Sequence, residues 1–195
     1  MEQRATGKKG TLFVVSGPSG SGKSTLCRAA AAQAGVHLSV SATTRPAGEG
    51  EVEGKDYYFL SDEDFLAEVQ AGQFLEYARV FDYYYGTPIQ PVREKLQEGQ
   101  SVVLEIDIQG GEQVFEKYPE AVGVLILPPS FEEMARRLRE RGRDDEETIQ
   151  KRLHQAQAEV EQAQMNSRYQ HTVVNDNLEQ AIEVLTTLIS PDKSD

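Results

Sequence analysis

A glycine-rich loop near the start of the chain has the residue types needed to bind phosphate. It fits the pattern G-x-x-x-x-G-K-[ST] and consists of Gly17, Pro18, Ser19, Gly20, Ser21, Gly22, Lys23 and Ser24. Glycines let the backbone curl so that successive N–H groups face one anion, and the start of a following helix adds partial positive charge. Lys23 can reach the β- and γ-phosphates of a nucleoside triphosphate, and the Ser24 hydroxyl can bind Mg²⁺. The loop alone leaves ATPases, GTPases, motors and kinases open.

Two carboxylates at the end of an apolar run are candidates to complete a metal site. Residues 102–104 lead directly into Glu105 and Asp107, and side-chain alternation puts both acids on one face of a strand. Mg²⁺ bound to phosphates needs further oxygen ligands, either directly or through water. An acidic strand end is otherwise commonplace. We therefore predict a metal role for this pair if the strand lies next to the phosphate loop.

The middle of the chain has groups that suit a second phosphate and a purine base. Hydroxyl and guanidinium donors in loop-rich sequence could hold the phosphate: Ser41, Arg45, Tyr57 and Tyr85. Glu76 and Thr87 suit guanine, because one carboxylate can accept bonds from N1–H and N2–H₂ while a hydroxyl donates to O6. Adenine would leave that buried carboxylate unpaired, at a cost of several kcal/mol. These residues favour a kinase with a guanine nucleotide as acceptor.

These groups need a scaffold that brings distant segments together. Short apolar runs at 11–16, 101–107, 121–127 and 171–174 are each bounded by turn or helix signals, which is typical of buried parallel strands. Helices are expected between them, the last over residues 178–189. This alternation predicts an α/β fold with a parallel sheet core flanked by helices.

The chain is expected to form a single domain over residues 1–195, with two additions to its core. A tyrosine-rich stretch at about 41–87 predicts an inserted mixed-sheet subdomain, including a helix that begins near Asp62 with Ser61 as its cap. An arginine-rich stretch at about 131–155 predicts a helical lid. The core is expected at about 10–40, 88–130 and 156–190.

Composition narrows the functional class. A formal net charge of −12 over 195 residues argues against a nucleic-acid or membrane-surface role, because both usually show a basic balance or stripe. Cys27 is the only cysteine, so no intrachain disulfide can form. No signal peptide is recognised, and no run approaches the roughly 20 apolar residues that span a bilayer. We expect a cytoplasmic protein, and the sequence does not separate a monomer from a homo-oligomer.

The chain resembles the guanylate kinases, nucleoside monophosphate kinases of the P-loop class, over about 180 residues. The matching segments, in the family's order and spacing, are SGPSGSGKSTL, SVSATTRP, GEVEGKDYYF, FLEYA, YYYGT, VVLEIDIQG, RLRERG, DEETIQKRL and VVNDNL. The resemblance implies a P-loop NTPase-type core with a GMP-binding insertion. It also implies reversible transfer of the ATP γ-phosphate to GMP or dGMP, with Mg²⁺ as cofactor.

The resemblance assigns roles to individual residues. ATP would be bound by the loop residues 17–24 together with Thr25, and Mg²⁺ by Ser24 and Glu105, partly through water. The GMP site would consist of Ser41, Arg45, Tyr57, Glu76, Tyr85, Thr87 and Asp107. The catalytic set would consist of Lys23, Arg45, Arg137, Arg141 and Arg152. Closure of the insertion and the lid would exclude water during transfer.

The sequence departs from the family pattern at three positions. Gly48 stands where the family commonly has a second phosphate-binding arginine, and Lys55 is a conceivable substitute. Losing one charge-assisted contact of about 1.5–3 kcal/mol would weaken GMP binding roughly tenfold or more. Thr87 replaces a serine and Glu105 an aspartate, and both keep the functional group.

Two other readings remain beside this one. Non-enzymatic guanylate-kinase-like modules bind proteins through the nucleotide-site surface, but typically have a degraded phosphate loop, whereas Gly22, Lys23 and Ser24 are present here. A P-loop kinase of a sugar bisphosphate would keep the chemistry and change the acceptor. Glu76 and Thr87 favour GMP over this second alternative.

Overall fold

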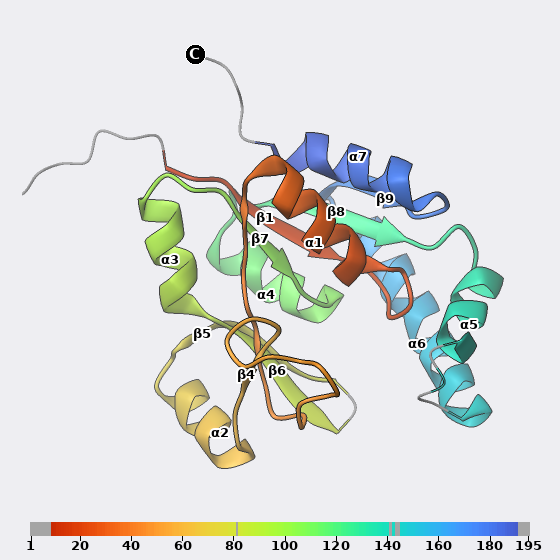
Figure 1. Ribbon diagram of the computed structural model, residues 1–195, viewed down its shortest axis with the longest axis horizontal. Coiled ribbons are helices and arrows are strands. Elements are labelled where there is room, and N and C mark those ends of the chain that lie inside the picture. The colour runs from red at the N-terminus through yellow and green to blue at the C-terminus, as the bar shows by residue number, and fades with distance from the viewer. Residues whose placement is uncertain (1–8, 81, 141, 143–144, 191–195) are drawn as a thin grey trace, which may run out of the picture.

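A five-stranded parallel sheet forms the centre of the molecule (Figure 1). The computed structural model describes residues 9–80, 82–140, 142 and 145–190. In spatial order the strands are β2 (His37–Leu38), β7 (Val102–Glu105), β1 (Leu12–Ser16), β8 (Val122–Leu127) and β9 (Tyr169–Val174). Every neighbouring pair is parallel. The predicted parallel α/β core is therefore confirmed.

Helices cover both faces of this sheet. Helices α1 (Lys23–Ala34) and α7 (Leu178–Ile189) pack on one face, and α3 (Ile89–Gln97) and α4 (Ile108–Lys117) on the other. The expected bounds of the last helix match α7. Within the described ranges, no helix combines the length and the apolar character needed to cross a membrane.

Side-chain alternation along β1 explains why both faces are covered. Phe13 and Val15 join the cluster under α1 and α7, whereas Leu12 and Val14 join the cluster under α3 and α4. All four side chains are at most 5% exposed. A strand buried on both faces reads as a continuous apolar run, which is why the sequence alone revealed it.

The insertion forms a second, mixed sheet below the core in Figure 1. Its strands are β3 (Ala42–Thr43), β4 (Tyr58–Phe59), β5 (Phe74–Val80) and β6 (Tyr83–Pro88), in the spatial order β4-β3-β6-β5. The β3–β4 pair is parallel and the other two pairs are antiparallel. The expected mixed-sheet insertion is therefore confirmed.

The insertion has a small aromatic core of its own. Helix α2 (Asp62–Gln70) begins after Ser61, whose hydroxyl accepts a hydrogen bond from the Asp64 N–H at 3.1 Å, as expected for its cap. Phe65 of α2 is fully buried and stacks on Phe74, with ring centroids 4.5 Å apart. These rings hold α2 against the mixed sheet.

The arginine-rich segment forms two helices at the edge of the core. Helix α5 (Phe131–Glu140) and the start of α6 (Glu146–Met165) pack through Met134, Leu138 and Ile149. Helix α6 is continuous over its 20 residues and so passes through the expected boundary at 155/156. The division into core, insertion and lid remains a prediction.

Phe65→Ala is expected to lower the free energy of unfolding by about 3–5 kcal/mol, because it leaves a cavity between α2 and the mixed sheet. Denaturant unfolding followed by circular dichroism measures this change. The matched control is Leu66→Ala on the same helix, since Leu66 is 40% exposed. An equal loss of stability in both variants would contradict the assignment of Phe65 as the centre of this core.

Candidate functional site

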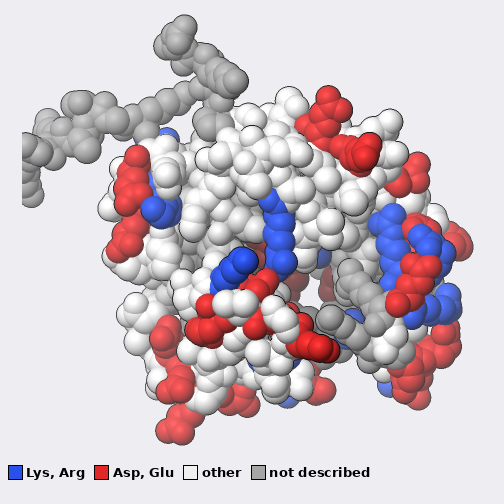
Figure 2. All heavy atoms as spheres, viewed as in Figure 1, with Lys and Arg blue, Asp and Glu red and all other residues white. Residues whose placement is uncertain are grey.

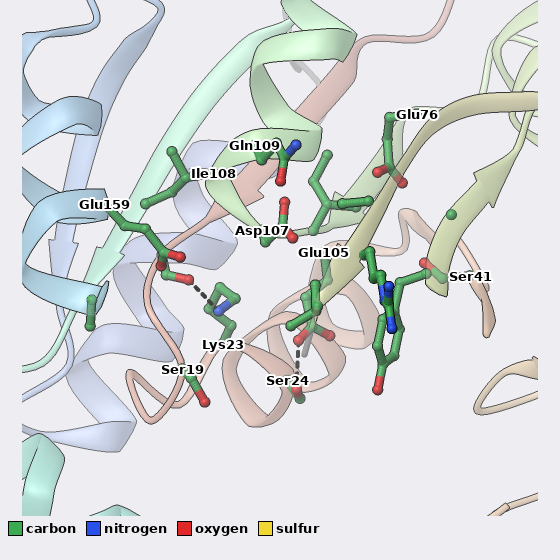
Figure 3. A pocket seen from close by; sticks show the side chains of 18 of the residues that line it. Ser19, Lys23, Ser24, Ser41, Glu76, Glu105, Asp107, Ile108, Gln109 and Glu159 are labelled. Atoms are coloured by element: carbon green, nitrogen blue, oxygen red, sulfur yellow. Dashed lines mark hydrogen bonds between the residues drawn. The ribbon is translucent and has the colours of Figure 1, made fainter. Parts of the chain in front are cut away.

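A cavity of about 1010 Å³ lies between the core and the insertion. Its walls come from the phosphate loop, α1, the end of β7, the start of α4, strands β5 and β6, and α6. Figure 2 shows acidic and basic side chains crowded around the hollow on this face. In Figure 3, Lys23 and Ser24 lie on one side, Ser41 and Glu76 on the other, and Glu105 and Asp107 between them.

The phosphate loop connects β1 to α1, as predicted. Gly22 caps α1 with φ 89°, a left-handed conformation that favours glycine. The Lys23 ammonium donates to the carbonyl oxygens of Gly17 at 2.5 Å and Pro18 at 3.2 Å. The predicted loop residues that line the cavity are Gly17, Ser19, Lys23, Ser24 and Thr25, whereas Pro18, Gly20, Ser21 and Gly22 complete the turn.

Asn175 supports the loop from behind. Its side-chain amide donates to the Ser21 carbonyl oxygen at 2.8 Å, and a Cβ on Gly22 would lie 2.2 Å from the same nitrogen. Arg137 of α5 donates to the Asn175 carbonyl oxygen at 2.9 Å and to Glu133 at 2.8 Å. Arg137 thus lies beside this support and is not among the cavity-lining residues.

Ser24 of the phosphate loop and Glu105 at the end of β7 are in direct contact. The Ser24 hydroxyl donates to the Glu105 carboxylate at 2.5 Å. These two hard oxygen donors fit Mg²⁺, which takes few protein ligands when phosphates and water supply the rest. The described residues contain no group of three or more His, Cys, Asp or Glu side chains arranged to hold a metal.

The charge of Lys23 is tuned by its surroundings. Burial lowers the pKa of the Lys23 ammonium, and the carboxylates of Glu105 and Asp107 act in the opposite direction. The predicted neighbourhood of the loop and the acidic strand end is therefore observed.

The predicted donors for a second phosphate converge on the cavity. Ser41, Arg45, Tyr57 and Tyr85 all line it. The rings of Tyr57 and Tyr85 meet edge to face with centroids 6.0 Å apart, and the Arg45 guanidinium carbon lies 5.5 Å from the Tyr57 centroid. Four side chains from three segments of the insertion thus form one wall.

Glu51 shares this wall, which the sequence did not indicate. One guanidinium nitrogen of Arg45 donates to both Glu51 oxygens at 2.9 Å, and the Gly48 N–H donates to Glu51 at 2.7 Å. Burial works to lower the pKa of Arg45, but hydrogen bonds with Glu51 and Tyr85 raise it overall. The backbone N–H at position 48 is thus bonded to Glu51, and Lys55 lines a neighbouring cavity of about 250 Å³.

Glu76 and Thr87 form a buried pair at the far end of the cavity. Glu76 is 4% exposed and accepts a 2.6 Å hydrogen bond from the Thr87 hydroxyl. Burial raises the pKa of Glu76 to about 7, although the bond from Thr87 works in the opposite direction. Thr87 lies behind the carboxylate and does not line the cavity, and its hydroxyl donates its hydrogen bond to Glu76.

The remaining predicted residues have different positions. Asp107 lines the cavity and also caps α4, accepting from the Gly110 N–H at 2.6 Å. Arg152 lines the cavity from α6. Arg141 lies outside the described residues.

Glu159 and Arg28 are among the further cavity residues that the sequence analysis did not single out. Glu159 faces the cavity from α6, and burial raises the pKa of its carboxyl. Arg28 of α1 lines the cavity and donates to Asp56 of the insertion at 2.6 Å. Glu159 lies on the charge-rich helix α6, where a lining residue has the same type as its solvent-facing neighbours.

Comparison with known proteins points to one family. A family model described as guanylate kinase matches residues 9–192. A guanylate kinase of Caldanaerobacter subterraneus subsp. tengcongensis is 46% identical over 187 residues, covering 95% of this chain and 89% of that protein. A guanylate kinase of Thermosynechococcus vestitus is 47% identical over 186 residues, covering 95% of this chain and 96% of that protein.

A solved structure agrees with the sequence relatives. The crystal structure of guanylate kinase from Anaplasma phagocytophilum superposes with a TM-score of 0.75 at 32% identity, covering 94% of this chain and 86% of that chain. The similarity therefore includes the parallel core and the inserted mixed sheet. Because the family model and the relatives extend over nearly its whole length, the chain belongs to the guanylate kinase family.

Proposed function

We propose that this chain catalyses the reversible transfer of the γ-phosphate of ATP to GMP, giving ADP and GDP. The observation that carries the proposal is one cavity with a phosphate loop at one end and the Glu76–Thr87 pair at the other. The loop suits the donor triphosphate, and the pair suits a guanine base. Arg45 and the tyrosines between them suit the acceptor phosphate.

The ATP half consists of the phosphate loop and the start of α1. Backbone N–H groups of residues 17–25 would surround the triphosphate, and Lys23 would exchange its carbonyl partners for phosphate oxygens. Ser24 and Glu105 would hold Mg²⁺, partly through water. When bound, the ion neutralises charge on the β- and γ-phosphates.

The GMP half combines a phosphate clamp with a base reader. Ser41, Arg45, Tyr57 and Tyr85 would hold the phosphate as hydrogen-bond donors. Ionised Glu76 would accept from guanine N1–H and N2–H₂, held in place by the Thr87 hydroxyl. Asp107 lies between the two halves and would assist in reading the base. Thr87 would act on the base through Glu76, because its hydroxyl is fully buried and donates its one hydrogen to that carboxylate.

Transfer needs no covalent protein nucleophile. An oxygen of the GMP phosphate attacks the γ-phosphorus, and the bond from that phosphorus to the bridging oxygen of ADP breaks. Lys23 and Arg152 would neutralise the transferring group, together with Arg141, and Arg45 would orient the acceptor. We also assign Arg137 to this set, acting beside the loop from its position on Asn175. The lone buried Cys27 suits a reducing compartment, so we place the reaction in the cytoplasm.

The direct test is ADP formation from ATP and Mg²⁺ with GMP, dGMP, AMP, CMP, UMP, a sugar bisphosphate or no acceptor. We expect ADP together with GDP or dGDP, and only background ADP with the other acceptors. Turnover with a sugar bisphosphate alone would replace the proposed acceptor. A folded chain that binds ATP and transfers phosphate to none of them would indicate the protein-binding alternative.

Lys23→Ala is expected to reduce kcat by about 10²–10³-fold, the usual loss when one fixed charge at a transition state is removed. The measurement is ADP release at saturating ATP and GMP. Lys95→Ala is the matched control, because Lys95 pairs with Glu98 on the surface of α3. A Lys23→Ala enzyme with wild-type kcat would disprove the role of the loop lysine.

The KM for GMP is expected to rise by up to tenfold per pH unit as pH falls below about 7. Burial raises the pKa of Glu76 to about 7, so the unliganded carboxyl becomes protonated there and loses the form that accepts from N1–H and N2–H₂. KM values measured between pH 5.5 and 8.5 test this.

Glu76→Gln is the control for this pH profile, because any remaining slope comes from the phosphate of GMP, whose own pKa lies near 6. The variant should have a KM for GMP about 10–100-fold higher at pH 8. Parallel profiles for the variant and the wild type would rule out titration of Glu76.

A further inference from the structure

The first turn of α4 carries a glycine whose Cα faces the Glu76 carboxylate. A Cβ built on Gly110 would lie 2.5 Å from the Glu76 Oε2 atom and 3.1 Å from its Cδ atom. The backbone does not need glycine here, because Gly110 is not among the residues with positive φ. Glycine in a helix costs about 1 kcal/mol relative to alanine, so the helix gives up stability at this position. What the glycine provides is space for the carboxylate.

Strand β5 is held against α4 by hydrogen bonds on both sides of Glu76. The Gln113 side chain donates to the Tyr77 carbonyl oxygen at 2.8 Å and accepts from the Tyr77 N–H at 3.3 Å. The Lys117 ammonium donates to the Leu75 carbonyl oxygen at 2.5 Å. The backbone before and after Glu76 is therefore attached to the same helix.

These contacts come from one side of α4. Gly110, Gln113 and Lys117 follow the spacing i, i+3 and i+7, which places them along one stripe of a helix. The stripe thus contains two residues with long polar side chains, Gln113 and Lys117, and one residue without a side chain, Gly110. The polar side chains attach the helix to the strand, and the glycine accommodates the Glu76 carboxylate between them.

The carboxylate itself has little freedom to move. Glu76 is 4% exposed, and its Oε1 atom accepts the 2.6 Å hydrogen bond from Thr87. The first turn of α4 also carries partial positive charge, which favours an ionised carboxylate beside it. Asp107 caps this turn by accepting from the Gly110 N–H at 2.6 Å, so a side chain on Gly110 would be caught between two carboxyl groups.

We propose that Gly110 is a positioning residue for guanine recognition, because it leaves the space in which the Glu76 carboxylate is held for the base. This inference rests on the proposed role of Glu76 as the guanine reader. Ordinary van der Waals contact begins near 3.4 Å, so an alanine at position 110 would move the Glu76 Oε2 atom by about 1 Å. A displacement of that size at a functional group can reduce activity by about 10²-fold.

The test is Gly110→Ala, assayed for both substrates. We expect the KM for GMP to rise by about 10–100-fold, the KM for ATP to stay within about twofold, and the preference for GMP over AMP to fall. Gly111→Ala is the matched control on the same helix. Its Cβ would approach the Tyr169 hydroxyl at 2.4 Å and not Glu76, so it should cost stability without changing base preference.

A double-variant cycle separates this inference from the proposed function. Glu76→Ala alone should raise the KM for GMP, and adding Gly110→Ala to it should change that KM less than about twofold, because no carboxylate remains to be displaced. The double variant also relieves the steric conflict, so it remains informative if Gly110→Ala alone is too unstable to assay.

Each other outcome overturns one statement. If Glu76→Ala leaves the KM for GMP unchanged, the proposed base reader is wrong and the inference on Gly110 is lost with it. If Glu76→Ala weakens GMP binding but Gly110→Ala does not, only the inference on Gly110 is wrong. The inference on Gly110 is also wrong if Gly110→Ala raises the KM for GMP equally with and without the Glu76 carboxylate. The effect of the substitution would then not depend on that carboxylate.

Discussion

The parallel pairing of β1 with its two neighbours positions the phosphate-loop end of the cavity. Because parallel strands end at the same edge of a sheet, the loop that leaves β1 emerges between the ends of β7 and β8. The register sets Val15 opposite Glu105, whose carboxylate then meets Ser24 in the first turn of α1. On the other side, a Cβ on Gly17 would lie 2.1 Å from the Ile126 carbonyl oxygen. The sheet thus determines both where the loop lies and where it must contain glycine.

Helix α4 connects the phosphate-loop end of the cavity to the end that contains Glu76. It begins at Ile108, three residues after Glu105 ends β7, so the Glu105 carboxylate and the helix that contacts β5 belong to one short segment. Asp107 caps the helix within that segment, and Gln113 and Lys117 attach the insertion farther along it. The distance between the two ends of the cavity is therefore set by a rigid helix rather than by a loop.

Local pairing explains how a chain of net charge −12 can present cations to anionic substrates. Arg45 is held by Glu51, and Arg28 by Asp56, so their guanidinium groups are oriented before a substrate arrives. Orienting groups in advance removes part of the entropic cost of binding and transfer. The acidic partners thus position Arg45 and Arg28 in the cavity wall, which bulk composition could not reveal.

The sequence by itself determined the phosphate loop, the buried strands and the last helix, because glycine spacing and apolar runs act over a few neighbouring residues. It also indicated which residues have hydroxyl, guanidinium and carboxylate groups suited to two nucleotides, and all but a few of these line one cavity. Only the tertiary structure decided that Arg137 lies beside Asn175, that Thr87 lies behind Glu76, and that Gly110 accommodates the Glu76 carboxylate. Those relations depend on distances between segments far apart in the chain, which arise only when the insertion packs on α4 and helices α5 and α6 pack beside the loop.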